Sequence, residues 1–386
     1  MIIETPDPTV PVYSTAVSGR TSRTAMRTAA TLLILGTLLV VVSHVGSSQI
    51  LRRRIEEKRR EQQAAAAQSQ VTPRGATSCD APLNLGFRIQ SFSSGLRAAV
   101  WYPTEGSESR FQYAVPLATA LAQDAPVADC GPYPLVVYSH GLGGCGTISV
   151  FFTEALARAG YIVAAPDHMD SKCKVDQPFS GSFLQRGEAP FRRPEKWSPA
   201  NYQNRADDIR RILDEMPSDP RFGRHIDRNH IGAAGHSLGG YTIAGLAGGW
   251  SSWRDERIKA ALLMSPYVAP FVSKGTLASL DIPIMYQGGT RDFGITPVVK
   301  KTGGAYDTTK PPKFFVELKG EGHLAWSNKI CREYGSVPAC IAESATARTI
   351  NEYGIAFFDR YLKGKNEPIL ERSNPELAEY RHSDRR

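Results

Sequence analysis

The chain has 386 residues with an ordinary hydrophobic share of 41%, which is enough for one large globular domain with appendages. Its formal net charge is +8, but residues 1–78 hold ten Lys and Arg against five Asp and Glu and so carry a surplus of five. Because the basic balance belongs largely to that segment, we expect no nucleic-acid partner.

Residues 29–50 are the most apolar stretch of the chain. No Asp, Glu, Lys or Arg lies between Arg27 and Arg52, and a helix over Leu32–Val42 would be apolar all round. At about 1.5 Å per residue this stretch is long enough to cross roughly 30 Å of hydrocarbon. We expect a transmembrane helix or signal anchor over 29–50, with a cleaved signal peptide as the alternative. Residues 1–28 are expected to be a disordered tail, and residues 51–78 a charged helical stalk and linker.

Two features give opposite indications of the side of the membrane on which the rest of the chain lies. Six Lys and Arg follow the apolar stretch within residues 52–60, against three before it, which favours a cytoplasmic domain. The six cysteines lack the CxxC spacing of zinc and redox sites, and Cys331 and Cys340 could form a disulfide in an oxidising compartment. Six unrelated buried thiols are the alternative. We give the cysteines more weight and expect a single-pass membrane protein with an extracytoplasmic domain.

Residues 79–366 alternate strands and helices, the pattern of a mostly parallel sheet covered by helices on both faces. The expected strands are Phe87–Phe92, Leu96–Tyr102, Pro134–Ser139, Ile162–Ala165, Ile231–Ala234, Ile258–Met264, Ile282–Tyr286 and Lys313–Leu318. The expected helices are Val150–Arg158, Tyr202–Met216 and Ala345–Leu362. Residues 170–200 are an insertion, either a lid over the sheet edge or a surface loop without substrate contact. Residues 367–386 are charged and are expected to be a loose tail.

A nucleophile elbow is indicated by Gly235-His236-Ser237-Leu238-Gly239, which follows a short apolar strand and precedes a helix of small residues. The turn forces the nucleophile into a strained backbone, and side chains two residues on either side would collide with the neighbouring strand and helix. We therefore expect Ser237 to be the nucleophile. A glycine-rich turn that merely contains a serine is the alternative.

A serine hydroxyl needs a base, so an elbow predicts an acid and then a histidine further along the chain. Asp292 follows the strand that ends at Tyr286, and His323 follows the strand that ends at Leu318, each in a glycine-rich loop. We predict His323 as the base and Asp292 as the acid that orients it. An Asp that only forms a turn is the alternative for Asp292, and Glu321 is then the next candidate for the acid.

The oxyanion hole requires a second backbone amide close to the nucleophile. A glycine loop, His140–Gly144, follows the strand Pro134–Ser139, as the esterase pattern requires. We predict that the Leu142 amide pairs with the Leu238 amide at the start of the helix after the elbow. The loop lacks the spacing of a dinucleotide site and the Lys-Ser/Thr pair of a phosphate site.

These motifs resemble the platelet-activating-factor acetylhydrolase and dienelactone-hydrolase-like branch of the α/β-hydrolases. The resemblance rests on Val100–Pro103, Pro132–Gly143, Gly160–Ala165 and Gly235–Gly240, and it covers roughly residues 83–363. It implies an α/β-hydrolase fold with an eight-stranded sheet and an acyl-serine mechanism, with Ser237 as nucleophile, His323 as base and oxyanion amides at Leu142 and Leu238.

Two positions depart from that branch. In the animal acetylhydrolases the acid follows the strand after the elbow helix, whereas here that strand ends in Met264-Ser265-Pro266 without a carboxylate. The acid is therefore expected on the next strand, as Asp292, which is similar to bacterial esterases and polyester-degrading cutinases. Dienelactone hydrolases use Cys where this chain has Ser237.

The sequence therefore predicts a serine carboxylic ester hydrolase for short-chain esters, including acetyl esters of phospholipids. The alternatives are a lipase or cutinase that acts on long-chain or polymeric esters, and a hydrolase-like binding protein without catalysis. We expect no cofactor and no metal. The expected partners are a small ester or lipid and, through the N-terminal helix, a membrane.

Overall fold

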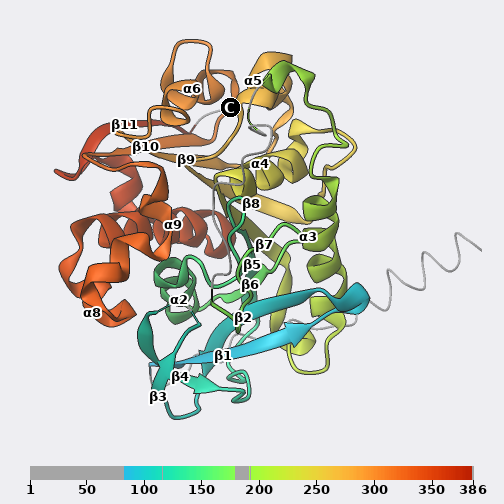
Figure 1. Cartoon of the computed structure of the whole chain (residues 1–386), viewed down its shortest axis with the longest axis vertical. Coiled ribbons are helices and arrows are strands. Elements are labelled where there is room, and N and C mark those ends of the chain that lie inside the picture. The colour runs from blue at the N-terminus through green and yellow to red at the C-terminus, as the bar shows by residue number, and fades with distance from the viewer. Residues whose placement is uncertain (1–81, 115, 179–190, 192, 385–386) are drawn as a thin grey trace, which may run out of the picture. The chain divides into compact units, whose positions relative to one another are not determined.

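A single sheet of eleven strands runs through the part of the chain that the structure describes (Figure 1). The computed structural model describes residues 82–384, except residues 115, 179–190 and 192. The strand order is β11-β10-β9-β8-β7-β5-β6-β2-β1-β4-β3. Six neighbouring strands at the centre are parallel: β6 (Ile162–Pro166), β5 (Tyr133–Ser139), β7 (Ile226–His236), β8 (Ile258–Met264), β9 (Ile284–Gly289) and β10 (Lys313–Leu318).

Further strands, most of them paired antiparallel, extend both edges of this parallel centre. On one side β2 (Arg97–Thr104) pairs with β6 and β1 (Asn84–Ser91), and the short strands β4 (Ala118–Gln123) and β3 (Ser109–Gln112) follow. On the other side β11 (Leu377–Ser383) pairs with β10. All eight expected strands are present. The strands β3, β4 and β11 are additions that the sequence pattern did not indicate.

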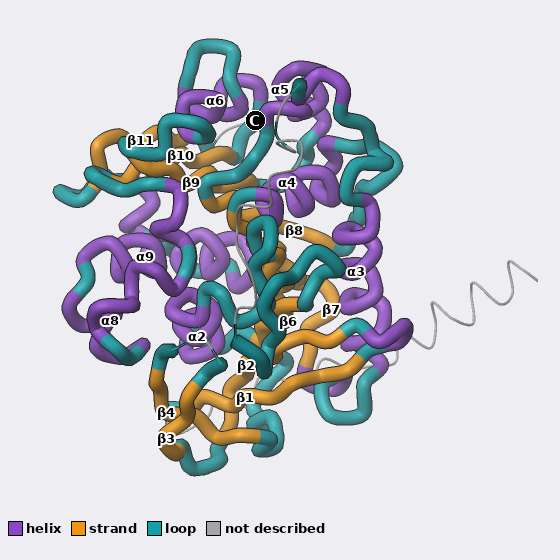
Figure 2. Tube along the Cα trace, viewed as in Figure 1, coloured by secondary structure: helices purple, strands orange, loops and turns teal. Residues whose placement is uncertain are grey.

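Helices cover both faces of the sheet (Figure 2). Side chains alternate along each strand, so Leu135 and Val137 of β5 pack on one face while Val136 and Tyr138 pack on the other. The first face is covered by α3 (Gln203–Glu215), α4 (Leu238–Ala244), α5 (Ala269–Lys274), α6 (Thr296–Lys300) and α7 (Ala305–Thr308). The second face is covered by α2 (Val150–Arg158), α8 (Val337–Glu343) and α9 (Ala345–Lys363).

One part of the predicted fold, the transmembrane helix, is not supported and must be corrected. No helix within the described part of the chain combines the length and the apolar character needed to span a bilayer. The longest of them, α9, has 19 residues, but it buries one face against the sheet and carries Asp359, Arg360 and Lys363 near its end. The predicted span over residues 29–50, the tail over 1–28 and the stalk over 51–78 lie outside the described residues.

The C-terminal segment also differs from the prediction of a loose tail. Leu377 is buried, and the Tyr380 hydroxyl donates a hydrogen bond to the Leu370 carbonyl at 2.7 Å. These contacts hold the segment as the edge strand β11. The high charge of this segment was the reason for predicting a tail. Charged side chains are also typical of edge strands, because they discourage pairing with another chain.

The insertion over residues 170–200 is described only in part. Its C-terminal portion packs by aromatic contacts: the ring centroids of Phe191 and Tyr267 lie 4.7 Å apart, and those of Trp197 and Tyr241 lie 5.0 Å apart. Tyr241 belongs to α4, so this portion lies against the helix that follows the predicted nucleophile.

Candidate active site

Ser237 stands on a sharp turn between β7 and α4. Its backbone is strained, with φ 55° and ψ −116°. A Cβ atom at Gly235 would lie 2.5 Å from the carbonyl carbon of Gly239, and one at Gly239 would lie 1.9 Å from the carbonyl oxygen of Ser139. Because no side chain fits at these contacts, both glycines are required for the turn that presents Ser237.

The structure brings the three predicted catalytic side chains together. The Nε2 of His323 lies 2.8 Å from the hydroxyl oxygen of Ser237, which is hydrogen-bond distance. The Asp292 carboxylate faces the other ring nitrogen, with its two oxygens 3.3 and 3.4 Å from Nδ1. The loops after β9 and β10 are joined by a hydrogen bond of 2.8 Å from the Arg291 amide to the Glu321 carbonyl. This pairing keeps Asp292 and His323 on adjacent loops at the same sheet edge.

A fourth side chain, which the sequence analysis did not identify, enters this group. The Oγ of Ser265, in the residue after β8, lies 2.7 Å from Nδ1 of His323 and donates a hydrogen bond to the Asp292 carboxylate. The sequence shows this position only as the Met264-Ser265-Pro266 terminus without a carboxylate. Ser265 could have been found from its position in the sheet, because it directly follows β8, the strand that pairs with the elbow strand β7.

His236 packs against His323 and supports its backbone. Its Nε2 donates a hydrogen bond of 2.8 Å to the His323 carbonyl, and its ring stacks on that of Trp326. Burial, together with the neighbouring His323, lowers the pKa of His236 from 6.5 to about 3. The ring therefore stays neutral at ordinary pH and fixes the backbone of His323.

The glycine loop after β5 lies beside the nucleophile. A Cβ atom at Gly141 would come within 3.3 Å of the Cβ atom of Ser237. Neither the Leu142 amide nor the Leu238 amide donates a hydrogen bond within the described residues, so both are free to receive an oxyanion. The Leu238 amide also lies at the N-terminus of α4, where the helix dipole favours negative charge.

Arg205 of α3 holds this loop from within the protein. Its guanidinium is fully buried and donates hydrogen bonds to the carbonyls of His140 at 2.6 Å and Gly141 at 3.2 Å. The carbonyl and N–H of one trans peptide point in opposite directions. With the Gly141 carbonyl directed toward Arg205, the Leu142 N–H is directed away from it.

Two further links fix the loop. Asp170 pairs with Arg205 at 2.7 Å and accepts a hydrogen bond from the Gly143 amide at 3.3 Å. Burial alone would raise the pKa of Asp170, but the Arg205 charge and hydrogen bonds bring it well below the usual value. A disulfide joins Cys145, next to the loop, to Cys173 in the insertion. The loop is thus tied to α3 and to the insertion.

The predicted pair Cys331 and Cys340 also forms a disulfide. It joins the 3-10 helix Asn328–Tyr334 to α8, in the segment that follows His323. The disulfide therefore constrains the chain on the C-terminal side of the catalytic histidine.

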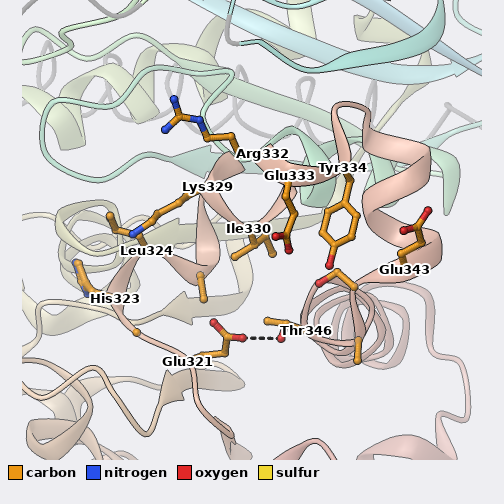
Figure 3. A pocket seen from close by; sticks show the side chains of 14 residues that line it. Glu321, His323, Leu324, Lys329, Ile330, Arg332, Glu333, Tyr334, Glu343 and Thr346 are labelled. Carbon is orange, nitrogen blue, oxygen red and sulfur yellow. Dashed lines mark hydrogen bonds between the residues drawn. The ribbon is translucent and has the colours of Figure 1, made fainter.

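Two cavities adjoin the loop that carries His323. One of about 340 Å³ is mainly apolar and reaches the oxyanion loop; its lining includes Leu117, Leu142, Ile148, His236 and Leu324. A larger one of about 860 Å³ is shown in Figure 3, with His323 at one side and charged residues around it. In that view Glu321 is hydrogen-bonded to Thr346 of α9 at 2.7 Å. The Glu321 carboxylate is thus engaged away from the imidazole, and Asp292 is the carboxylate that faces it.

One group of side chains in the described part of the chain has the spacing of metal ligands. It consists of Glu371, His382 and Asp384, all exposed and close to β11. Arg360 forms ion pairs with Glu371 and Asp384. The group lies outside the candidate active site.

Parts of the chain are similar to platelet-activating factor acetylhydrolases. The family description platelet-activating factor acetylhydrolase, isoform II, matches residues 92–184, a range that contains the oxyanion loop. The platelet-activating factor acetylhydrolase of dog (Canis lupus familiaris) is 24% identical over 271 residues, covering 62% of this chain and 59% of that protein. The guinea pig (Cavia porcellus) protein is 23% identical over 268 residues, covering 62% and 60%. The chain thus spans about 60% of the length of these relatives.

A solved structure of a ferulic acid esterase from Streptomyces cinnamoneus is similar over most of the chain. The TM-score is 0.55 at 21% identity, and the match covers 79% of this chain and 98% of that one. This likeness shows that the two chains share a fold. The resemblance to the platelet-activating-factor acetylhydrolase branch, predicted from the sequence, is confirmed.

Proposed function

We propose that this chain is a serine carboxylic ester hydrolase that acts on short acyl esters in the manner of an acetylhydrolase. The observation that carries the proposal is the 2.8 Å contact between the hydroxyl of Ser237 and Nε2 of His323, on an elbow next to free backbone amides. The names of the relatives and the match over residues 92–184 support it.

The proposed reaction proceeds through an acyl-enzyme. His323 accepts the hydroxyl proton at Nε2 while the oxygen of Ser237 attacks the ester carbonyl. The amides of Leu142 and Leu238 stabilise the negative charge that develops on the carbonyl oxygen. His323 then gives the proton to the leaving alcohol. In the second half a water molecule takes the place of the alcohol: His323 accepts a proton from the water as it attacks the acyl group, and returns that proton to the oxygen of Ser237 as the acid leaves. Asp292 holds the imidazole orientation throughout.

A labelling experiment tests the nucleophile. A fluorophosphonate probe should label the wild-type protein at Ser237, and the Ser237→Ala variant should remain unlabelled. Equal labelling of the two proteins would refute the assignment.

Substrate length is tested with p-nitrophenyl esters from acetyl to palmitoyl. The relatives are named acetylhydrolases, and this supports a preference for short acyl chains. We expect the highest kcat/KM for acetyl and butyryl esters. Turnover no greater than that of Ser237→Ala would favour the non-catalytic binding protein.

A second candidate, a lipase or cutinase, is favoured by one feature. Among the residues that the structure describes, three large apolar side chains are exposed, and each adjoins a residue of the site or of the oxyanion-loop anchor: Met169 is 81% exposed, Phe293 80% and Leu324 47%. Phe293 follows Asp292 directly, and Leu324 follows His323. Exposed apolar groups around a catalytic centre suit a water-insoluble ester. A rise of activity above the solubility limit of a long-chain ester would select this candidate.

We also propose that the catalytic domain works in an oxidising, extracytoplasmic compartment. The disulfides Cys145–Cys173 and Cys331–Cys340 support this, since such bonds persist mainly outside the cytoplasm. Intact cells would be alkylated with and without reductant, and the peptides analysed by mass spectrometry. Free thiols at these positions in freshly quenched material would refute the proposal.

A further inference from the structure

We propose that Ser265 is a positioning residue of the ester-hydrolysis site, whose hydroxyl links Asp292 to Nδ1 of His323. The inference rests on the proposed function and adds a fourth member to its catalytic group. It assigns to Ser265 the direct contact with the imidazole and to Asp292 the role of orienting that hydroxyl.

The distances around Nδ1 identify Ser265 as its nearest partner. Its Oγ lies 2.7 Å from Nδ1, whereas the two carboxylate oxygens of Asp292 lie at 3.3 and 3.4 Å. Hydrogen bonds of the N–H···O type span about 2.7 to 3.2 Å. The hydroxyl of Ser265 is therefore within this range, and the carboxylate of Asp292 is beyond it.

The direction of the hydrogen bonds fixes the tautomer of the imidazole. An ionised carboxylate only accepts, so the single proton of the Ser265 hydroxyl is directed to Asp292. The lone pairs of that oxygen then face Nδ1, which must carry a proton to make the contact. Nε2 is left without one and can accept the proton of the Ser237 hydroxyl 2.8 Å away. This is the tautomer that the proposed mechanism needs.

The backbone at Ser265 gives independent support. Its φ is +41°, in the left-handed region that glycine adopts most readily. The side chain is completely buried, and its amide is bonded to the Gln287 carbonyl of β9 at 2.7 Å. Glycine would suit this conformation better than serine. The contacts of the Ser265 hydroxyl with Asp292 and His323 explain why a serine is present.

Two variants separate the hydroxyl from the backbone. Ser265→Ala and Ser265→Gly both remove the hydroxyl, but only glycine relieves the left-handed backbone, so Ser265→Gly should melt at the higher temperature. Both should lower kcat for p-nitrophenyl acetate by about 10- to 100-fold, the scale of a misplaced catalytic group, with KM changed less than twofold. Thr309→Val is the control, because Thr309 is also buried and its hydroxyl bonds Tyr286 and the Ala305 carbonyl away from the site. Its kcat should equal that of wild type.

A rescue experiment distinguishes positioning from simple packing. Asp292→Asn should be nearly inactive, and Ser265→Asp placed in that background should raise kcat at least tenfold, because it supplies a carboxylate next to Nδ1. The role of Ser265 would be overturned if Ser265→Gly had the same kcat as the wild-type protein, or if Ser265→Asp gave no rescue. In either case, ester hydrolysis by the wild-type protein would leave the proposed function standing. A wild-type protein without esterase activity and without labelling at Ser237 would overturn both.

Discussion

Replacing Arg205 by Met would remove the buried guanidinium that holds the oxyanion loop. Arg205 donates to the carbonyls of His140 and Gly141 at 2.6 and 3.2 Å and pairs with Asp170 at 2.7 Å. Met has a similar length but no donor. The substitution therefore leaves two carbonyls and one carboxylate without this partner.

The loss of stability follows from the ion pair. Breaking a buried pair costs about 3 to 5 kcal/mol, and we expect about 3 kcal/mol because the Asp170 side chain is 22% exposed. Asp170→Asn in the Arg205→Met background should restore part of this, since it removes the unpaired charge.

The loss of activity has a different cause and should behave differently. Without Arg205 the Gly141 carbonyl keeps, among the described residues, only the hydrogen bonds from the Gly144 amide at 3.0 Å and from Nδ1 of His140 at 2.7 Å. The peptide between Gly141 and Leu142 is then less firmly held, so the Leu142 amide points less reliably at the oxyanion. Removal of one oxyanion donor typically lowers kcat by roughly 10² to 10³. Asp170→Asn should not restore kcat, because it returns no donor to the Gly141 carbonyl.

Urea denaturation and p-nitrophenyl acetate kinetics measure the two effects separately, at a temperature where every variant is folded. Arg257→Met is the control: Arg257 pairs with Asp214 and Asp255 at 2.6 and 2.7 Å but does not contact the site. It should lose stability and keep kcat. If Arg205→Met is folded and its kcat stays within threefold of wild type, the assignment of Leu142 as an oriented oxyanion donor is refuted.

Three further predictions concern the acid, a disulfide and acid stability. Asp292→Asn should lower kcat by about 10⁴, as expected for an imidazole left in the wrong tautomer, while circular dichroism stays unchanged. Replacing Cys145 and Cys173 by Ser should cost about 3.6 kcal/mol in urea denaturation, since the disulfide spans 28 residues, against about 2.6 kcal/mol for the other bridge, which spans 9. The pKa of His236 falls from 6.5 to about 3 on folding, so the unfolded chain takes up the proton first. The contribution of the neutral His236 ring to the free energy of unfolding is therefore complete above pH 6.5. It is lost as the pH falls toward 3, which lowers the free energy of unfolding by up to about 5 kcal/mol. His236→Gln should lose correspondingly less stability over this window; equal acid sensitivity would contradict the reasoning.

The sequence was sufficient to predict the elements that depend on local pattern. The elbow could be read because its glycines and Ser237 are consecutive, and Asp292 and His323 because each follows a buried strand in a glycine-rich loop. The structure brings these three side chains together.

Residues that depend on the spatial neighbourhood could not be predicted in the same way. A single serine such as Ser265 has no distinctive pattern, and its contacts arise only because β8 and β9 are adjacent in the sheet. Arg205 lies in α3 among Asp207, Asp208, Arg210 and Arg211, so nothing in the local pattern distinguishes it as a buried cation.

The insertion over residues 170–200 is fastened at both described ends. Cys173 is bonded to Cys145 beside the oxyanion loop, and the rings of Phe191 and Trp197 pack on Tyr267. The oxyanion loop is thus cross-linked to the N-terminal part of the insertion, while its C-terminal part packs beside the helix that begins after the nucleophile. Reducing the Cys145–Cys173 bridge would therefore loosen the oxyanion loop and leave the aromatic attachment at Trp197 intact.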